Sequence, residues 1–375
     1  MRLRSTFFIL LLVAACGARQ EDSLSSDSSP LGEDEQSLSG RTLGSWRYVG
    51  QAARAQEAEP RRDPIHYTHR AKPALSPVEQ VLRTTKEDAD GRIYALNGLN
   101  ERVRRELSAI PAMPETLDPE APAPGTEMTV YPLGWDKRDC NNDGDDDWFI
   151  WDNDDRAVIA SPSAPRQRAV VRITSTAGQC TGTVLRDRWV LTAAHCTYTA
   201  SGTAAGSYSV RNWAGESVGV SLVFRGPGYS PSSFDPEDDY VLLKLSSSFP
   251  TATGDMDISD ISDSNINTVD DRFHNLGFPG LLNACSTANS TLVHTDNNQV
   301  TGKSNRTIRW KGDASGGHSG GPLYYCPSND ISQCDSDDKG FVVATVTGFS
   351  GYYNRNIGPR GAYFKDWAVS IMDNN

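Results

Sequence analysis

Excess positive charge is absent from this sequence of 375 residues. Asp and Glu number 48 against 36 Lys and Arg, which gives a formal net charge of −12. Proteins that bind nucleic acid need clustered Lys and Arg to neutralise phosphates. The acidic balance therefore excludes nucleic acid as a partner.

Long hydrophobic runs are absent too. The apolar stretch at residues 7–15 is too short to cross a bilayer, and no other run is long and apolar enough to do so. Because Arg2 and Arg4 precede it, residues 1–15 are predicted to be a signal peptide. The tetrapeptide at residues 13–16 resembles a bacterial lipobox, which would attach lipid to Cys16; ordinary cleavage after Ala15 is the alternative. We expect an exported protein, either a bacterial cell-envelope lipoprotein or a secreted one, with membrane contact only through that lipid.

Cysteines are few. There are seven, and lipidation of Cys16 would leave six, an even number. An oxidising compartment makes disulfides the default, but six cysteines allow 15 connectivities, so the sequence alone does not choose among them.

The N-terminal third shows little pattern. Residues 17–40 are rich in Ser and acidic residues, which is typical of a disordered tether. Weak helical character follows at residues 77–86 and 100–108, and five prolines at residues 111–125 indicate a stiff linker. We therefore expect residues 16–130 to be a tether and a propeptide, largely disordered or weakly helical. A stalk that is never removed is the alternative.

From about residue 148 the sequence consists of short β-rich runs separated by turn residues. Such runs occur at residues 169–173, 189–191, 240–243 and 341–345. Regular short strands with turn signals predict an all-β barrel or sandwich. Near the end, one helical face carries apolar residues and predicts a C-terminal helix packed on the β core; these residues are Phe364, Trp367, Ala368 and Ile371.

Three motifs carry residues suited to nucleophilic catalysis. His195 ends Leu-Thr-Ala-Ala-His, Asp239 precedes an apolar run, and Ser319 lies in Gly-Gly-His-Ser-Gly-Gly-Pro. A serine hydroxyl needs an adjacent base, and a carboxylate on the other ring nitrogen of His fixes its tautomer. The glycines around Ser319 let backbone N–H groups converge on one point, so Gly317 and Ser319 are the candidate oxyanion donors. Each motif alone is usually structural; the ordered set predicts catalysis.

Together these motifs resemble the trypsin/chymotrypsin superfamily, and most closely its bacterial glutamyl-endopeptidase branch. The similarity covers about residues 150–372. It is carried further by Asp154-Asp155-Arg156, Arg168-Ala169-Val170-Val171, Cys180-Thr181-Gly182, Gly277-Phe278-Pro279-Gly280, Asp313-Ala314-Ser315-Gly316-Gly317 and Tyr353-Asn354-Arg355.

The resemblance implies a chymotrypsin-like double β-barrel with a C-terminal helix. A serine protease domain is then expected at residues 156–375, after an acidic activation or linker segment at residues 131–155. The implied activity is that of a serine endopeptidase with protein or peptide substrates, acting as a monomer and without a cofactor. A catalytically silent surface lipoprotein that uses the same fold for binding is the alternative. An α/β-hydrolase esterase is disfavoured because its serine would come first.

Two departures from the family pattern concern the site. His318 stands where animal trypsin-like enzymes have an Asp that pairs with the new N-terminus, so activation through that ion pair is not expected. Its side chain is expected to point away from the Ser319 hydroxyl. The substrate pocket is expected to involve Asp313, Ala314, Thr345, Val346, Thr347 and Gly348. The glutamyl branch uses a histidine to bind Glu, and the corresponding position in this sequence is Val343 or Ala344. The residue preferred before the cleaved bond therefore stays open.

The resemblance also implies disulfides Cys180–Cys196 and Cys326–Cys334, which leaves Cys140 for Cys285. An Asp-rich run begins like a Ca²⁺ loop, with oxygen ligands at alternate positions and Gly144 at the sixth. Its candidate ligands are Asp139, Asn141, Asp143 and Asp145. Ile150 occupies the twelfth position, where a bidentate Glu is usual, and a solvated acidic loop is the alternative.

Overall fold

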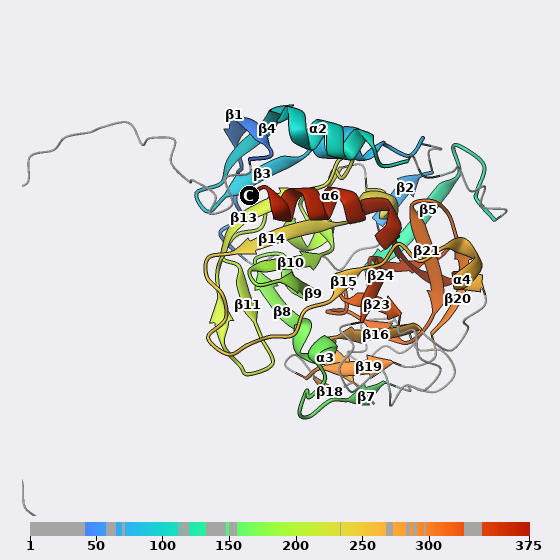
Figure 1. Cartoon of the computed structure of the whole chain (residues 1–375). Coiled ribbons are helices and arrows are strands. Elements are labelled where there is room, and N and C mark those ends of the chain that lie inside the picture. Colours follow the sequence, from blue (N-terminus) through green and yellow to red (C-terminus); the bar gives the residue numbers. More distant parts are fainter. Residues whose placement is uncertain are drawn as a thin grey trace, which may run out of the picture. The chain divides into compact units, whose positions relative to one another are not determined.

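Apolar runs of the middle third form the centre of a ten-stranded sheet in the computed structural model (Figure 1). Strands β10 and β14 pair antiparallel with Leu191 opposite Leu242, and both side chains are fully buried. Burial of such side chains is the main stabilising contribution to this sheet. The strands of this part are β8 Val170–Ser175, β9 Gly178–Arg186, β10 Trp189–Thr192, β11 Ser209–Arg211, β12 Ser217–Val218, β13 Val220–Arg225 and β14 Val241–Leu245.

The structure describes residues 42–57, 65–69, 72–111, 113, 120–132, 148–149, 156–232, 234–267, 273–282, 286–287, 291–295, 298–325 and 340–375. Within them, no helix is both long and apolar enough to span a membrane. Several expectations fall outside these residues: the signal peptide, Cys16, the tether, the Asp-rich Ca²⁺ candidate, and the pairs Cys326–Cys334 and Cys140–Cys285.

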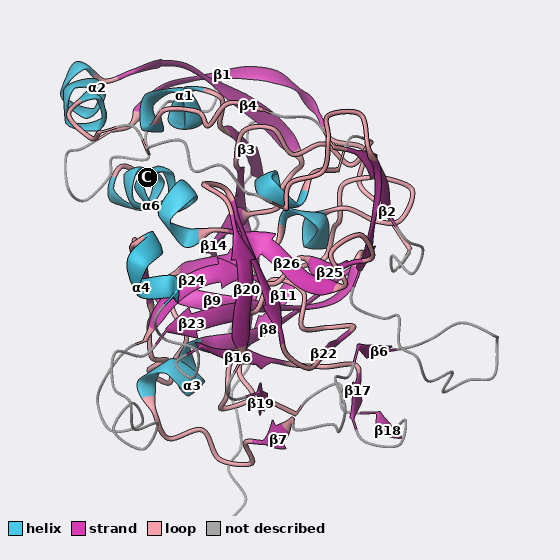
Figure 2. Cartoon of the chain, turned by 90° about the vertical axis from the view of Figure 1, so that its right-hand side faces the viewer, coloured by secondary structure: helices cyan, strands magenta, loops and turns pink. Residues whose placement is uncertain are grey.

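Two six-stranded sheets contain the C-terminal strands, and the second of them also includes two strands from the N-terminal region (Figure 2). The first has the order β15-β24-β23-β16-β19-β7 and the second β2-β5-β25-β26-β21-β20. The strands of the first are β7 Ala157–Val158, β15 Asp257–Ile258, β16 Phe273–Gly277, β19 Val293–Thr295, β23 Pro322–Tyr325 and β24 Phe341–Thr345. Those of the second are β2 Ile65–Thr68, β5 Glu127–Pro132, β20 Gln299–Lys303, β21 Thr307–Lys311, β25 Gly348–Ser350 and β26 Arg355–Pro359. Two short pairs accompany these sheets: β17 Leu281–Leu282 with β18 Ser286–Thr287, and β22 Ala314–Ser315 with β6 Trp148–Phe149.

The first two helices begin at recognisable caps, Ser76 for α1 and Asn100 for α2. Ser76 and Glu79 form a reciprocal capping box at the start of α1, with Pro77 in its first turn. The predicted C-terminal helix is confirmed, because all four residues of its apolar face are buried. The helices are α1 Pro77–Leu82, α2 Glu101–Ser108, α3 Pro165–Ala169, α4 Asp263–Asn267 and α6 Gly361–Asp373, with 3₁₀ turns η1 Ala194–Thr197 and η2 Pro236–Asp238.

The expectation of a largely disordered or weakly helical region before residue 130 is wrong for the described residues 42–132. The two weak helices are present as α1 and α2, although α1 ends at Leu82 and Lys86 lies in a strand. Three further strands belong to the ten-stranded sheet, at its edge and in the order β1-β4-β3-β13. They are β1 Gly44–Gln51, β3 Thr85–Asp88 and β4 Arg92–Leu99. Of these, β3 is a charged segment that has little strand propensity of its own. Its pairing with β13, far along the chain, stabilises it as a strand.

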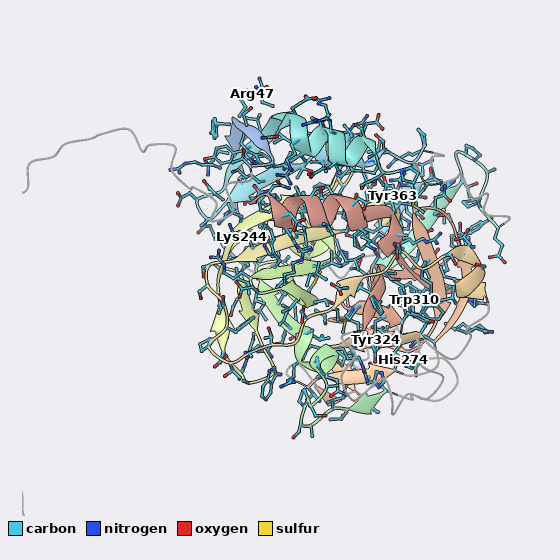
Figure 3. The ribbon with its side chains drawn as sticks, viewed as in Figure 1. Arg47, Lys244, His274, Trp310, Tyr324 and Tyr363 are labelled. Carbon is cyan, nitrogen blue, oxygen red and sulfur yellow. A yellow bond between two sulfur atoms is a disulfide. The ribbon has the colours of Figure 1, made fainter. Side chains whose placement is uncertain are left out.

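This N-terminal region also packs on α6. The side-chain amide of Gln80 donates to the carbonyl oxygen of Tyr363, a residue labelled in Figure 3, at 3.0 Å. The indole N–H of Trp367 donates to the Thr84 hydroxyl at 2.8 Å, and both groups are buried. Val81, Val103 and other apolar residues of the region belong to the same buried cluster as the first sheet. The described residues between positions 42 and 132 are therefore part of the fold and contribute to its core.

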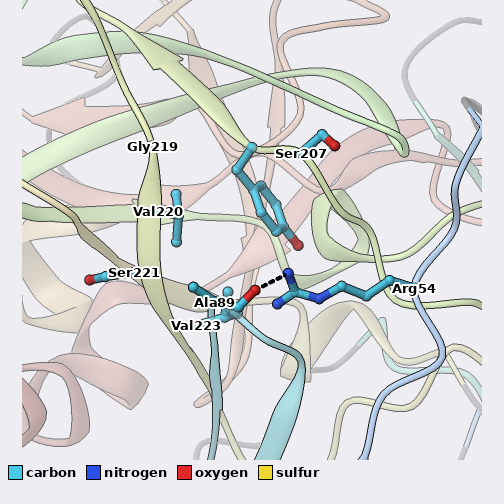
Figure 4. A pocket seen from close by; sticks show the side chains of 8 residues that line it. Arg54, Ala89, Ser207, Gly219, Val220, Ser221 and Val223 are labelled. Carbon is cyan, nitrogen blue, oxygen red and sulfur yellow. Dashed lines mark hydrogen bonds between the residues drawn. The ribbon is translucent and has the colours of Figure 1, made fainter. Parts of the chain in front are cut away.

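A cavity of about 250 Å³ lies between the N-terminal region and the first sheet. Arg54 reaches across it, and its Nη1 donates to the Ala89 carbonyl oxygen at 2.7 Å (Figure 4). Tyr208 and residues 219–221 of the sheet line the other side.

Candidate active site

His195 lies in η1, directly after β10. The disulfide Cys180–Cys196 joins this turn to β9, as expected, and the imidazole is 6% exposed. Because β10 is paired with β9 and with β14, the backbone before His195 is fixed on both sides.

Asp239 lies between η2 and β14 and is completely buried. One carboxylate oxygen accepts the backbone N–H of His195 at 2.7 Å, and the other lies 2.7 Å from its ring Nδ1. A carboxylate cannot donate, so Nδ1 carries a proton, and in the neutral imidazole Nε2 is then the acceptor. The two contacts fix both the orientation and the tautomer of the imidazole.

Ser319 lies in a glycine-rich turn that packs against the backbone just before His195. A Cβ atom at Gly320 would come within 2.7 Å of the Ala193 nitrogen, and its φ is +80°, so only glycine fits there. The Ser319 carbonyl oxygen accepts the N–H of Thr181 at 2.8 Å. The sheet and the turn together place Ser319 and His195 on adjacent segments.

The peptide between Gly316 and Gly317 has a fixed orientation. The Gly316 carbonyl oxygen accepts the N–H of Gly280 at 2.5 Å. In a planar trans peptide the N–H points opposite to the carbonyl, so the Gly317 N–H is directed away from Gly280. Gly317 has a φ of +98°, and a Cβ atom there would lie 2.3 Å from the Phe278 carbonyl oxygen.

Thr181 supports the same turn. Its hydroxyl donates to the Gly317 carbonyl oxygen at 2.6 Å and accepts the Phe278 N–H at 2.9 Å. Arg156 contributes from the other direction, since its buried guanidinium donates to the Ser315 hydroxyl at 2.8 Å. Sequence reasoning did not assign these roles. Both residues lie in motifs that carry the family resemblance, but hydrogen bonding to a distant turn leaves no local pattern.

His318 is buried beside the turn. Its Nδ1 accepts the backbone N–H of Ser315 at 3.0 Å. The ring thus faces the backbone of Ser315, in agreement with the expectation that it is directed away from the Ser319 hydroxyl.

The six expected pocket residues lie in two groups. Asp313 and Ala314 are buried in or next to β22, six and five residues before Ser319. The other four run from the end of β24 into β25, where Val346 exchanges hydrogen bonds with Gly320 and Gly321 at 2.7 and 2.9 Å. The hydroxyls of Thr345 and Thr347 are buried and have no hydrogen-bond partner among the described residues.

A group of charged side chains surrounds η2, immediately before Asp239. Arg306 forms ion pairs with Glu237 and Asp238, and Lys72 of the N-terminal region with Asp238 and Asp235. Burial, followed by the negative charge of Asp235, raises the pKa of Glu237 to about 7. Burial likewise raises the pKa of Asp238. The three carboxylates exceed the two cations that face them.

The raised pKa of Glu237 predicts a pH-dependent stability. The folded protein binds this proton more tightly than the unfolded chain, so the contribution is complete below pH 4.5 and is lost as the pH rises through about 7. We expect the free energy of unfolding to fall by about 1–3 kcal/mol over this range and Glu237→Gln to reduce that fall. Denaturant titrations of both proteins at pH 5 and pH 8 measure it; an equal fall in both would contradict the assignment.

Comparison with known proteins places this chain in a family. Residues 158–352, more than half of the chain, match the family model described as Trypsin. The chain is 29% identical to "Glutamyl endopeptidase" of Bacillus licheniformis over 179 residues, which is 46% of this chain and 53% of that protein. It is 30% identical to "Trypsin I-P1" of Gallus gallus over 101 residues, which is 26% of this chain and 40% of that protein. The chain thus spans about half of the length of these relatives.

A similar solved structure is titled "Structure of Glu endopeptidase in complex with MPD". It shares 16% identity at a TM-score of 0.48, with 60% of this chain and 100% of that chain covered. The predominance of strands, the C-terminal helix and the family match confirm the fold expected from the sequence. The chain belongs to the trypsin family of serine proteases.

Proposed function

We propose that this protein is a serine endopeptidase in which Ser319, His195 and Asp239 form the catalytic triad. The observation that carries the proposal is the double contact of the buried Asp239 with His195, at 2.7 Å to the backbone N–H and 2.7 Å to Nδ1. With Nδ1 held by Asp239, the neutral imidazole presents Nε2 as the acceptor, which is the tautomer that a general base for a serine hydroxyl requires.

In the proposed reaction the Ser319 oxygen attacks the scissile carbonyl while His195 Nε2 takes the hydroxyl proton. The N–H groups of Gly317 and Ser319 stabilise the oxyanion. The imidazolium returns the proton to the leaving amine, and an acyl-enzyme remains. Water, deprotonated by His195, then releases the acid and restores Ser319.

The residues expected around the substrate side chain are Asp313, Ala314 and the segment from Thr345 to Gly348. The buried hydroxyls of Thr345 and Thr347 give this segment a polar lining. We propose that they contact the side chain before the cleaved bond, in protein or peptide substrates. We further propose export, with lipid attachment at Cys16 and secretion as the two alternatives, and a monomer that needs no cofactor for the chemistry.

The test uses the full mature chain and the same chain with Ser319→Ala. Both are treated with a small sulfonyl fluoride, and the labelled residue is identified by mass spectrometry. Both are then incubated with a mixed peptide library, before and after limited proteolysis. Labelling of Ser319, and cuts made only by the unaltered chain, are expected, and the residue before each cut gives the specificity. A folded chain with neither labelling nor cuts would support the silent binding protein instead.

Thr181 gives a sharper test of the same site. Thr181→Val removes the hydroxyl that holds the Gly317 carbonyl oxygen but keeps the shape of the side chain. We expect kcat to fall roughly 10- to 100-fold, because a small displacement of the turn misplaces the oxyanion donors. KM should change little and Thr181→Ser should retain most of the activity. Equal losses in both variants would indicate a packing role only.

A further inference from the structure

The strand β25 borders the proposed site. Val346, two residues before β25, exchanges hydrogen bonds with the two glycines that follow Ser319. One edge of β25 pairs with β26. Its other edge is the position at which an extended peptide could add as a strand and direct its backbone towards Ser319.

This second edge is occupied by the chain's own β5. Val130 lies opposite Ser350 and Pro132 opposite Gly348 in an antiparallel pairing. The N–H of Gly351 donates to the carbonyl oxygen of Thr129 at 3.0 Å. The pairing runs so that β5 ends at Pro132, beside the end of β25 that is nearer to Val346.

Side chains of β5 are inserted into the protein behind this edge. Val130 is completely buried and Met128 is 3% exposed. Both belong to an apolar cluster with Tyr67 of β2, Phe234 and Ile357. Full burial of a Val side chain contributes about 1.5–3 kcal/mol, so β5 is held by packing as well as by backbone hydrogen bonds.

Ion pairs hold the flanking segments in place. Lys72 lies 2.7 Å from Asp235 and 3.1 Å from Asp238, next to Asp239. Glu120 lies 3.2 Å from Arg309. Further along, β6 pairs with β22, whose residues Ala314 and Ser315 precede Ser319 by five and four positions. Segments upstream of the protease domain thus pair with strands on both sides of the Ser319 turn.

We propose that residues 127–132 act as an intramolecular inhibitor, in which β5 occupies the edge of β25 that an extended peptide substrate would use. The inference rests on the proposed endopeptidase function. Because β5 is tethered, it competes at an effective concentration in the millimolar range, above that of most substrates. The pairing of β5 runs along the edge of β25 and not along the Ser319 turn, so we expect small reagents to reach Ser319 while a long peptide is excluded.

The test compares the unaltered full chain, Val130→Asp and Val49→Asp. Val130→Asp buries a charge behind β5 and is expected to detach β5 from β25. Val49→Asp makes the same change on β1, where Val49 is 47% exposed, and is the matched control. We expect kcat/KM for a six-residue peptide substrate to rise at least about 10-fold in Val130→Asp alone. The rate at which a small sulfonyl fluoride labels Ser319 should agree within about twofold in all three, because β5 is paired with β25 and a small reagent does not use that strand edge.

Two further measurements extend the test, and the first of them does not depend on the folding of that variant. The unaltered chain should hydrolyse a single-residue ester readily and the six-residue peptide only slowly. A synthetic peptide of residues 120–132 should inhibit Val130→Asp, and the same peptide with Asp at position 130 should not. Hydrolysis of the long peptide by the unaltered chain at the rate of Val130→Asp would overturn the proposal. A chain in which Ser319 is never labelled would instead refute the proposed function, and the inhibition with it.

Discussion

Asp239→Asn is expected to lower kcat about 10⁴-fold with little change in KM. The replacement is nearly isosteric, and its oxygen can still accept the backbone N–H of His195 that Asp239 accepts at 2.7 Å. Its amide, however, donates to Nδ1 where the carboxylate accepted. The proton then moves to Nε2, and the ring can no longer take the Ser319 proton. The expected loss therefore arises from the wrong tautomer and not from lost structure.

Asp238→Asn is the matched control for this experiment. Asp238 adjoins Asp239 in sequence and is equally shielded from solvent, but its partners are Arg306 and Lys72. We expect it to change kcat by less than about 10-fold, since it touches no reacting group. Hydrolysis of a single-residue ester is the suitable assay, because that substrate does not need the β25 edge. Similar losses in both variants would mean that Asp239 acts only through the fold of this loop.

The candidate site was accessible to sequence reasoning because its chemistry demands particular residue types in short motifs. His195, Asp239 and Ser319 each lie beside a strand or turn whose local pattern is readable, and Phe341–Thr345 was predicted with the bounds that β24 has. The disulfide Cys180–Cys196 followed from the family resemblance and is present. What the motifs could not show is how the turn before Ser319 is held, because Thr181 and Gly280 reach it from far along the chain.

The strands of the N-terminal region were not predicted from the sequence, for a related reason. The segment of β3, Thr-Lys-Glu-Asp, is charged and has no alternating apolar pattern. It forms a strand because β13 offers an edge about 135 positions later, with Glu87 opposite Val223. Likewise β5 contains a proline and follows a proline-rich stretch, and it forms a strand where it pairs with β2 on one edge and with β25 on the other. Long-range pairing of this kind overrides local propensity and is invisible to a window of neighbouring residues.

Glu87→Ala is expected to destabilise the whole protein by about 3–5 kcal/mol. The Glu87 side chain is completely buried and binds Arg225 of β13 at 2.7 Å and Arg54 at 2.8 Å. Its removal leaves the guanidinium of Arg225, 7% exposed, without its carboxylate partner.

The size of that loss measures how far residues 42–132 belong to the fold of the protease domain. Denaturant titrations of the full chain give the free energy of unfolding, and Glu106→Ala is the control, because its pair with Arg102 lies exposed on α2 and should contribute less than about 0.5 kcal/mol. The double variant Glu87→Leu with Arg225→Met should recover most of the loss, since it removes both charges together. A loss below about 1 kcal/mol for Glu87→Ala would mean that β3 can leave β13 at little cost. A large loss would mean that the protein keeps its N-terminal region bound even where β5 is released from β25. Inhibition would then be relieved by local detachment of one strand and not by departure of the whole region.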